Sequence, residues 1–219
     1  MTEHFGVKLA SEKALKLNRN DFALIDTKPS LPFFKSLADK NAYADKYGKN
    51  YTEKWCNDYR ELCLKNFDLN MTYFTMLDEN RFNCILDSFL EQYNVFEEIF
   101  DLKPYARTEG YYIMVLDEYK QVYIGKTGDI KRRIMQHWSK TKPFDRTLFP
   151  MYAYDKSCFS IDFFRALDTT RIFVWRHTMS NGIEEDLICH FPAKYCTNRI
   201  GGDISDAIMC VGSMNERLF

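Results

Sequence analysis

The stretch GYYIMVLDEYKQVYIGKTGDIKRRIMQH, residues 110–137, decides the fold of this chain. Residues 112–116 and 121–124 are rich in aromatic and β-branched side chains and flank a short polar turn. That pattern predicts a β-hairpin. Asp129 is a good helix N-cap residue, and apolar side chains recur after it at helical spacing. The stretch therefore predicts two antiparallel strands followed by an amphipathic helix.

Working outward, residues 171–175 (RIFVW) predict a third strand, residues 183–190 a helix, and residues 159–167 a short helix. Before the hairpin, apolar side chains recur every three or four residues from Thr52 to Phe67 and from Asp78 to Tyr93, which is typical of helices. Pro104 predicts the end of this helical region.

These patterns predict an α+β fold in two parts. Residues 1–104 form a mainly α-helical N-terminal module. Residues 105–219 form a domain with a small, mainly antiparallel, three-stranded sheet flanked by helices, and a C-terminal tail of mixed character. A chain of 219 residues with 46% apolar and 16% aromatic residues is large enough for such packed cores.

Composition narrows the class of protein. No apolar run approaches the roughly 20 residues that a membrane helix needs. The first residues lack the apolar core of a signal peptide, so we expect a cytoplasmic protein without a membrane partner. The seven cysteines are odd in number and include no Cys-x-x-Cys pair, which disfavours a disulfide framework and a structural zinc site.

Basic residues gather around the predicted helix that follows the hairpin, although the net charge of the chain is −1. Such a cluster can neutralise phosphates, and binding through it would depend on salt. It is equally typical of a solvated helix face, so charge alone leaves both interpretations open. The cluster comprises Lys120, Lys126, Lys131, Arg132, Arg133, Lys140, Lys142 and Arg146, against two acidic residues, Asp129 and Asp145.

The order of these features resembles the catalytic domain of the GIY-YIG endonucleases over residues from about 108 to 202. The first motif stands as Gly110-Tyr111-Tyr112, with tyrosine in place of the usual central isoleucine. The second is intact as Tyr123-Ile124-Gly125. Because side chains alternate along a strand, Tyr111 should point away from Tyr112, so this departure is minor.

The resemblance extends to residues outside the hairpin. Arg133 lies ten residues after Tyr123, as the family's arginine does, and His137 follows one helical turn later. The family's glutamate precedes an apolar pair, which corresponds to Glu184 in Glu184-Glu185-Asp186-Leu187-Ile188. Since only one of two neighbours on a helix can face a site, Glu184 is preferred to Glu185. Asn198, after a turn that contains proline, completes the pattern.

The resemblance implies a divalent-metal-dependent DNA endonuclease that hydrolyses phosphodiester bonds. It implies Mg²⁺ or Mn²⁺ on Glu184, which suits a metal that keeps several waters. It also implies Tyr112 as the general base, Tyr123 as the residue that positions water or phosphate, and Arg133 as the residue that stabilises the phosphate. His137 is a further catalytic candidate, as a phosphate ligand or as a group that lowers the tyrosine's pKa.

Four residues are expected to bind or frame the substrate. Gly125 permits close backbone approach, Lys126 and Arg132 supply positive charge, and Asn198 fixes the site by hydrogen bonding. Lys126 shares with His137 the expected effect on the tyrosine's pKa or on phosphate binding.

Two alternatives remain open at this point. The domain could have kept the fold as a catalytically silent module that binds nucleic acid or a partner. The first 100 or so residues match no family, and could determine specificity, form a homodimer, or bind an inhibitor.

Overall fold

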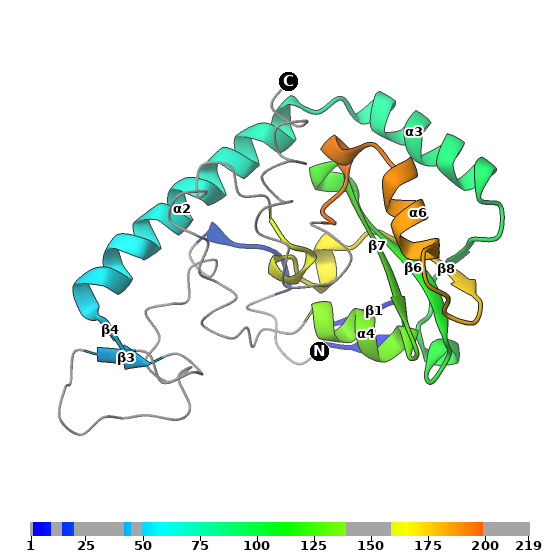
Figure 1. Cartoon of the computed structure of the whole chain (residues 1–219), viewed down its shortest axis with the longest axis horizontal. Coiled ribbons are helices and arrows are strands. Elements are labelled where there is room, and N and C mark those ends of the chain that lie inside the picture. Colours follow the sequence, from blue (N-terminus) through cyan, green and yellow to red (C-terminus); the bar gives the residue numbers. More distant parts are fainter. Residues whose placement is uncertain (1, 10–14, 20–41, 45–49, 139–158, 199–219) are drawn as a thin grey trace.

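In the computed structural model, the described residues are 2–9, 15–19, 42–44, 50–138 and 159–198, and they form a mixture of helices and antiparallel sheets (Figure 1). The strands are β1 (Glu3–His4), β2 (Val7–Lys8), β3 (Ala42–Ala44), β4 (Asn50–Thr52), β5 (Glu97–Ile99), β6 (Gly110–Leu116), β7 (Gln121–Thr127) and β8 (Arg171–Arg176). The α-helices are α2 (Glu53–Met76), α3 (Glu79–Gln92), α4 (Ile130–His137) and α6 (Ile183–His190). Short 3-10 turns are η4 (Lys103–Tyr105), η5 (Asp117–Tyr119), η7 (Ile161–Phe163), η8 (Ala166–Asp168) and η9 (Ala193–Tyr195).

The main sheet has four strands in the order β5-β8-β6-β7, and every neighbouring pair is antiparallel. The predicted hairpin is confirmed as β6 and β7, which place Tyr112 opposite Gly125. The predicted number of three strands is wrong, because β5 pairs with the outer edge of β8. Three residues are too few to show the alternation of apolar and polar side chains that indicates a strand. Strand β5 also lies in the stretch that we assigned to the helical region.

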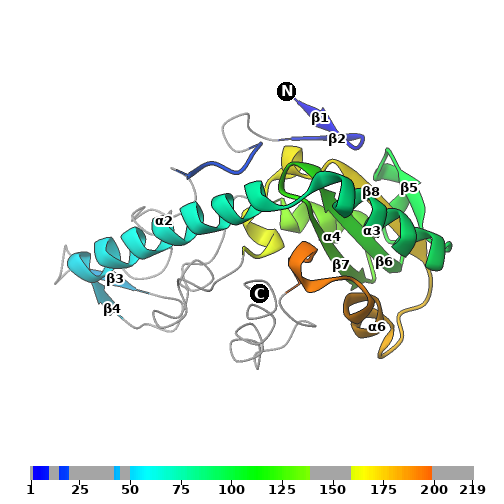
Figure 2. The same ribbon diagram turned by 90° about the horizontal axis from the view of Figure 1, so that it is seen from above.

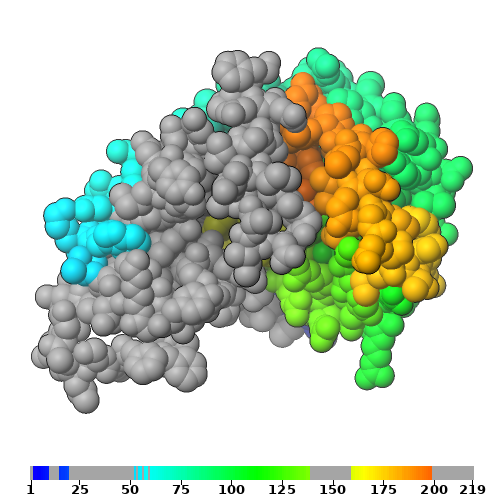
Figure 3. Space-filling model, in the orientation of Figure 1, coloured from blue at the N-terminus to red at the C-terminus, as the bar shows by residue number. Residues whose placement is uncertain are grey.

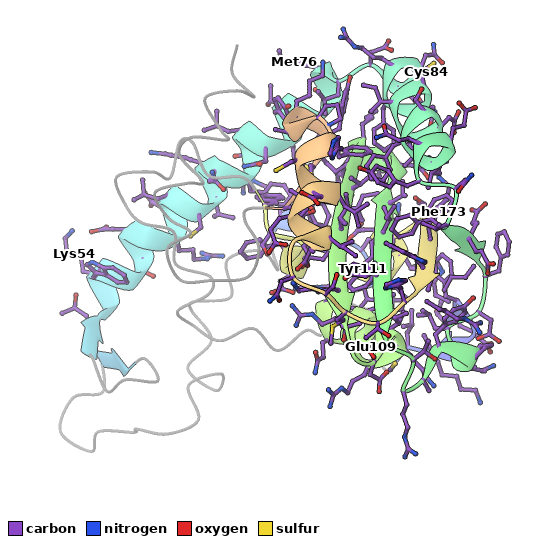
Figure 4. The ribbon with its side chains drawn as sticks, turned by 45° about the vertical axis from the view of Figure 1, so that its right-hand side comes forward. Lys54, Met76, Cys84, Glu109, Tyr111 and Phe173 are labelled. Carbon is purple, nitrogen blue, oxygen red and sulfur yellow. The ribbon has the colours of Figure 1, made fainter. Side chains whose placement is uncertain are left out.

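Every residue of β6 is buried, because the sheet is covered on both faces. Tyr112, Met114 and Leu116 join a core with residues of α2 and α4. Their neighbours on the strand join a second core with residues of α3 and α6. Figure 1 shows α6 across one face of the sheet, and the label on Tyr111 in Figure 4 marks a side chain of that face.

The N-terminal helices are confirmed, and each begins after a side-chain cap: Thr52 accepts from the backbone N–H of Trp55, and Asp78 from that of Arg81. Figure 2 shows the outer part of α2 extending beyond the sheet, and Figure 4 places Lys54 at that far end and Met76 near the sheet. The inner part of α2 packs against η5, where the ring centroids of Phe74 and Tyr119 lie 5.5 Å apart.

Both hydrophobic cores combine residues from before and after residue 104, where we placed the domain boundary. The hairpin of β1 and β2 also contacts the later chain: His4 Nε2 lies 2.7 Å from the Thr169 carbonyl oxygen. In addition, the Leu102 N–H donates to the Phe5 carbonyl oxygen at 3.0 Å. The described residues before position 104 therefore share their cores with the sheet, and they contain short strands as well as helices.

The helices α4 and α6 have the predicted positions. Asp129 caps α4 by accepting from the Arg132 N–H at 3.0 Å. Two 3-10 turns, η7 and η8, replace the short helix expected over residues 159–167, because Phe164 and Arg165 between them are extended. Among the helices of the described residues, none combines the length and apolar character of a membrane span.

Candidate active site

The outer edge of β7 organises the site. In an edge strand, the backbone groups of alternate residues have no neighbouring strand to bond. At Ile124 both groups are bonded to one side chain: its N–H donates to Asn198 Oδ1 at 2.8 Å, and its carbonyl accepts from Asn198 Nδ2 at 2.6 Å. Asn198 thereby holds the segment after η9 against β7.

The next outward-facing N–H of β7, that of Lys126, donates to Glu184 Oε1 at 3.1 Å. Oε2 of the same carboxylate lies 3.4 Å from the Lys126 ammonium nitrogen. Figure 3 shows α6 (orange) on the surface of the molecule, and the helix register turns Glu184 inward while Glu185 is exposed. Burial raises the pKa of the Glu184 carboxyl, and the charge of Lys126 opposes that shift.

Two phenols lie side by side on the face of the sheet that α4 covers. The rings of Tyr112 and Tyr123 are 6.1 Å apart, and Tyr112 is fully buried. They are diagonal neighbours in the ladder, because Tyr112 pairs with Gly125 and Tyr123 pairs with Met114. With no side chain on Gly125, the position opposite Tyr112 is left open for its ring.

We expect Gly125→Ala to disturb the site. An added Cβ at this position would lie 2.6 Å from both Cζ and the hydroxyl oxygen of Tyr112, which is enclosed and cannot move aside. Overpacking of this kind costs about 1–3 kcal/mol of unfolding free energy, which urea denaturation would measure. The matched control is Gly128→Ala, where the nearest atom to the added Cβ is the Met179 Cε at 3.9 Å. Equal stability of the two variants would contradict this account of Gly125.

Helix α4 brings His137 to the phenols. His137 is 1% exposed, and its Nε2 lies 2.8 Å from the Tyr112 hydroxyl. Its ring packs edge-on against Tyr123, with centroids 4.9 Å apart. On the other side of the ring, Nδ1 lies 2.9 Å from Oδ1 of Asp162 in η7. We did not predict Asp162, and no motif or periodicity in its surroundings marks it.

Arg133 belongs to the same group, although the residue as a whole is exposed. Burial raises the pKa of Tyr112 well above its usual value, and the Tyr123 phenol adds to that shift. Burial also raises the pKa of Tyr123. The Arg133 guanidinium faces both hydroxyls and opposes these shifts through its charge and its hydrogen-bonding capacity, whereas Glu184 adds to them. Both phenols are therefore protonated at neutral pH.

The structure thus gathers most of the predicted residues at one place. Tyr112, Tyr123, Arg133 and His137 are in mutual contact or electrostatic range, and Glu184 with Lys126 completes the group at the edge of β7. Arg132 lies on the exposed face of α4. Three members of the basic cluster lie outside the described residues: Lys140, Lys142 and Arg146.

The donor set at Glu184 suits one kind of metal site. Among the described residues, no three His, Cys, Asp or Glu side chains form a cage for an ion. Mg²⁺ keeps several waters and often takes one carboxylate together with substrate phosphate, so a single glutamate at a strand edge fits it. The Lys126 ammonium, 3.4 Å from the carboxylate, would have to move away from an arriving cation.

Comparison of the chain with protein-family models, with curated proteins and with solved structures finds no match.

Proposed function

We propose that this chain is a divalent-metal-dependent DNA endonuclease of the GIY-YIG type. The observation that carries the proposal is the gathering of two phenols, an imidazole, a guanidinium and a carboxylate at one end of β7. These groups come from four elements, β6, β7, α4 and α6, and they belong to Tyr112, Tyr123, His137, Arg133 and Glu184. A structural role for any one of them would not require all five to meet.

Tyr112 is the residue to which we assign proton removal from the attacking water. A phenol with an ordinary pKa near ~10 is a weak base at neutral pH, and burial makes its ionisation still harder. The phenolate has to be made by passing its proton to a neighbour, and His137 Nε2 is within hydrogen-bonding distance. Because Tyr112 is enclosed in the free protein, water has to enter with the substrate on the side of Arg133, which is exposed.

Positive charge on the exposed side supports phosphate binding. Arg133 presents a rigid fork of donors, which suits the oxygens of a scissile phosphate. Lys126 lies at the same edge, and its ammonium would be free to contact a phosphate if Glu184 held a cation. Arg132 is exposed on α4, where it would contact a flanking phosphate and contribute to a salt-dependent affinity.

Glu184 would hold Mg²⁺ or Mn²⁺, with water and phosphate oxygens as the other ligands, and the bound ion would supply Lewis acidity to the leaving 3′-oxygen. The partly buried position of Glu184 keeps its carboxylate next to Lys126 and within electrostatic range of both phenols. Asn198 and Gly125 have structural roles in the site. Asn198 fixes the edge of β7, and Gly125 leaves space for the ring of Tyr112.

The test is incubation of the purified chain with a mixed pool of single- and double-stranded DNA in Mg²⁺, Mn²⁺ or EDTA, followed by sequencing of the ends. We expect cleavage with either metal and its loss in EDTA. DNA binding without cleavage under every metal condition would overturn the enzyme proposal and support the catalytically silent module.

A further inference from the structure

We propose that Asp162 is a positioning residue that holds His137 in the form able to accept the proton of Tyr112. This inference rests on the proposed nuclease function and deepens it, since it names how the base of that site is made ready.

Three polar side chains form a continuous line from the interior of the sheet to the surface. The Tyr112 hydroxyl lies 2.8 Å from His137 Nε2, and His137 Nδ1 lies 2.9 Å from Asp162 Oδ1. Exposure increases along the line, from 0% for Tyr112 and 1% for His137 to 27% for the side chain of Asp162. The carboxylate is therefore the solvent end of a path that begins at a buried phenol.

The chemistry of the two ends decides which ring nitrogen carries the proton. A carboxylate only accepts hydrogen bonds, so Nδ1 of a neutral His137 must carry the hydrogen and donate it to Asp162. The lone pair of Nε2 then faces Tyr112, whose O–H donates to it. With the opposite tautomer, Nε2 would carry the hydrogen and could not receive the phenol proton.

The proton transfer that follows is balanced without any oxidant or reductant. The Tyr112 O–H bond breaks and an N–H bond forms at His137 Nε2, which leaves a phenolate and an imidazolium beside the Asp162 carboxylate. The phenolate takes a proton from water, and the water oxygen bonds to phosphorus as the 3′-oxygen leaves with the electron pair of its bond. The 3′-oxygen takes up a proton from solvent. The imidazolium releases one proton to solvent and returns to the Nδ1–H form, which the hydrogen bond to the Asp162 carboxylate favours.

Asp162 is well placed to hold this geometry. Its own N–H is capped by the side chain of Ser160 at 3.4 Å, and its carbonyl accepts from Arg165 Nη1 at 3.3 Å. Within the part of the chain that the structure describes, the charged and titratable groups seen around the imidazole are Tyr112 of β6, Tyr123 of β7 and Asp162 of η7, joined by Arg133 of α4 and, through the phenols, Glu184 of α6.

Asp162→Asn in the full chain tests the inference. An amide can donate as well as accept, so it can turn and stabilise the wrong tautomer of His137. We expect the maximal cleavage rate to fall at least about tenfold with little change in KM, since loss of general-base function costs this much or more. Loss of the carboxylate also disfavours the imidazolium, so the rising limb of the pH–rate profile should move to lower pH. Asp162→Glu, which keeps the charge, should restore part of the rate.

A second measurement does not depend on nuclease activity. Nitrogen-15 NMR of the wild-type imidazole should show the hydrogen of His137 on Nδ1, and Asp162→Asn should change that distribution. A wild-type Nε2–H tautomer, or an Asp162→Asn variant that has the wild-type rate and pH profile, would overturn the inference. Absence of cleavage by the wild type would overturn the nuclease proposal instead, while the NMR result would still decide the role of Asp162 toward His137.

Discussion

Glu184→Gln is expected to lower the cleavage rate at least about 100-fold, because a metal acting as a Lewis acid contributes several kcal/mol and each ~1.4 kcal/mol is a factor of ten. Glutamine has nearly the same shape and keeps an oxygen that can accept from the Lys126 N–H, which is bonded to Glu184 at 3.1 Å. The substitution therefore removes the negative charge and leaves the contact between α6 and β7 in place.

Single-turnover cleavage at increasing Mg²⁺ concentration measures this effect. The matched control is Glu185→Gln, since Glu185 is the exposed neighbour on the same helix and should leave the rate unchanged. Comparable losses in both variants would point to a general effect of charge on DNA binding. A Glu184→Gln variant with the wild-type rate would rule out Glu184 as the metal ligand and leave it a structural partner of Lys126.

The local features of the fold could be predicted because their causes are local. The hairpin follows from two short β-prone segments around a turn, and the caps Thr52, Asp78 and Asp129 each accept from a backbone N–H three residues later. The preference for Glu184 over Glu185 likewise depends only on the helix register, and the structure turns Glu184 toward β7.

Features that depend on distant partners could not be predicted. Strand β5 forms because β8 offers an unpaired edge. The three residues of β5 are too few to show an alternation of apolar and polar side chains in the sequence. Asp162 reaches His137 from a 3-10 turn 25 residues later, placed there by the packing of its buried neighbours Ile161 and Phe163 in the core. Neither the identity nor the spacing of these residues resembles a motif.

The position of the N-terminal helices could not be predicted either, because it depends on distant partners. An apolar stripe shows that one face of a helix is buried, but it does not show what covers that face. Here the stripe of α3, through Phe82, Leu86 and Phe89, packs against the sheet in the core that also holds Leu187 of α6. Substitutions on the buried face of α3 should therefore affect the candidate site through the strands that this face contacts. Substitutions in an independent helical module would have no such effect.

Tyr112→Phe is expected to reduce the maximal cleavage rate about 10²–10⁴-fold, the range that a general base contributes. The ring remains and still fills the space opposite Gly125, so the packing of β6 is preserved. The hydroxyl is lost, and the buried Nε2 of His137 loses the partner at 2.8 Å. Loss of a hydrogen bond costs about 0.5–1.5 kcal/mol of unfolding free energy, so stability should be measured by urea denaturation beside the rate.

The neighbouring tyrosine separates the chemical effect from the structural one. Tyr111 is also fully buried on β6, but its hydroxyl faces the other side of the sheet, where it accepts from the Ser180 N–H at 2.9 Å. Tyr111→Phe should lower stability by about 1 kcal/mol and leave cleavage intact. If the two variants lost activity equally, a buried phenol would matter only for packing. A large loss confined to Tyr112→Phe is what a proton acceptor at the scissile phosphate requires, because the two variants differ mainly in the face of the sheet from which the hydroxyl is removed.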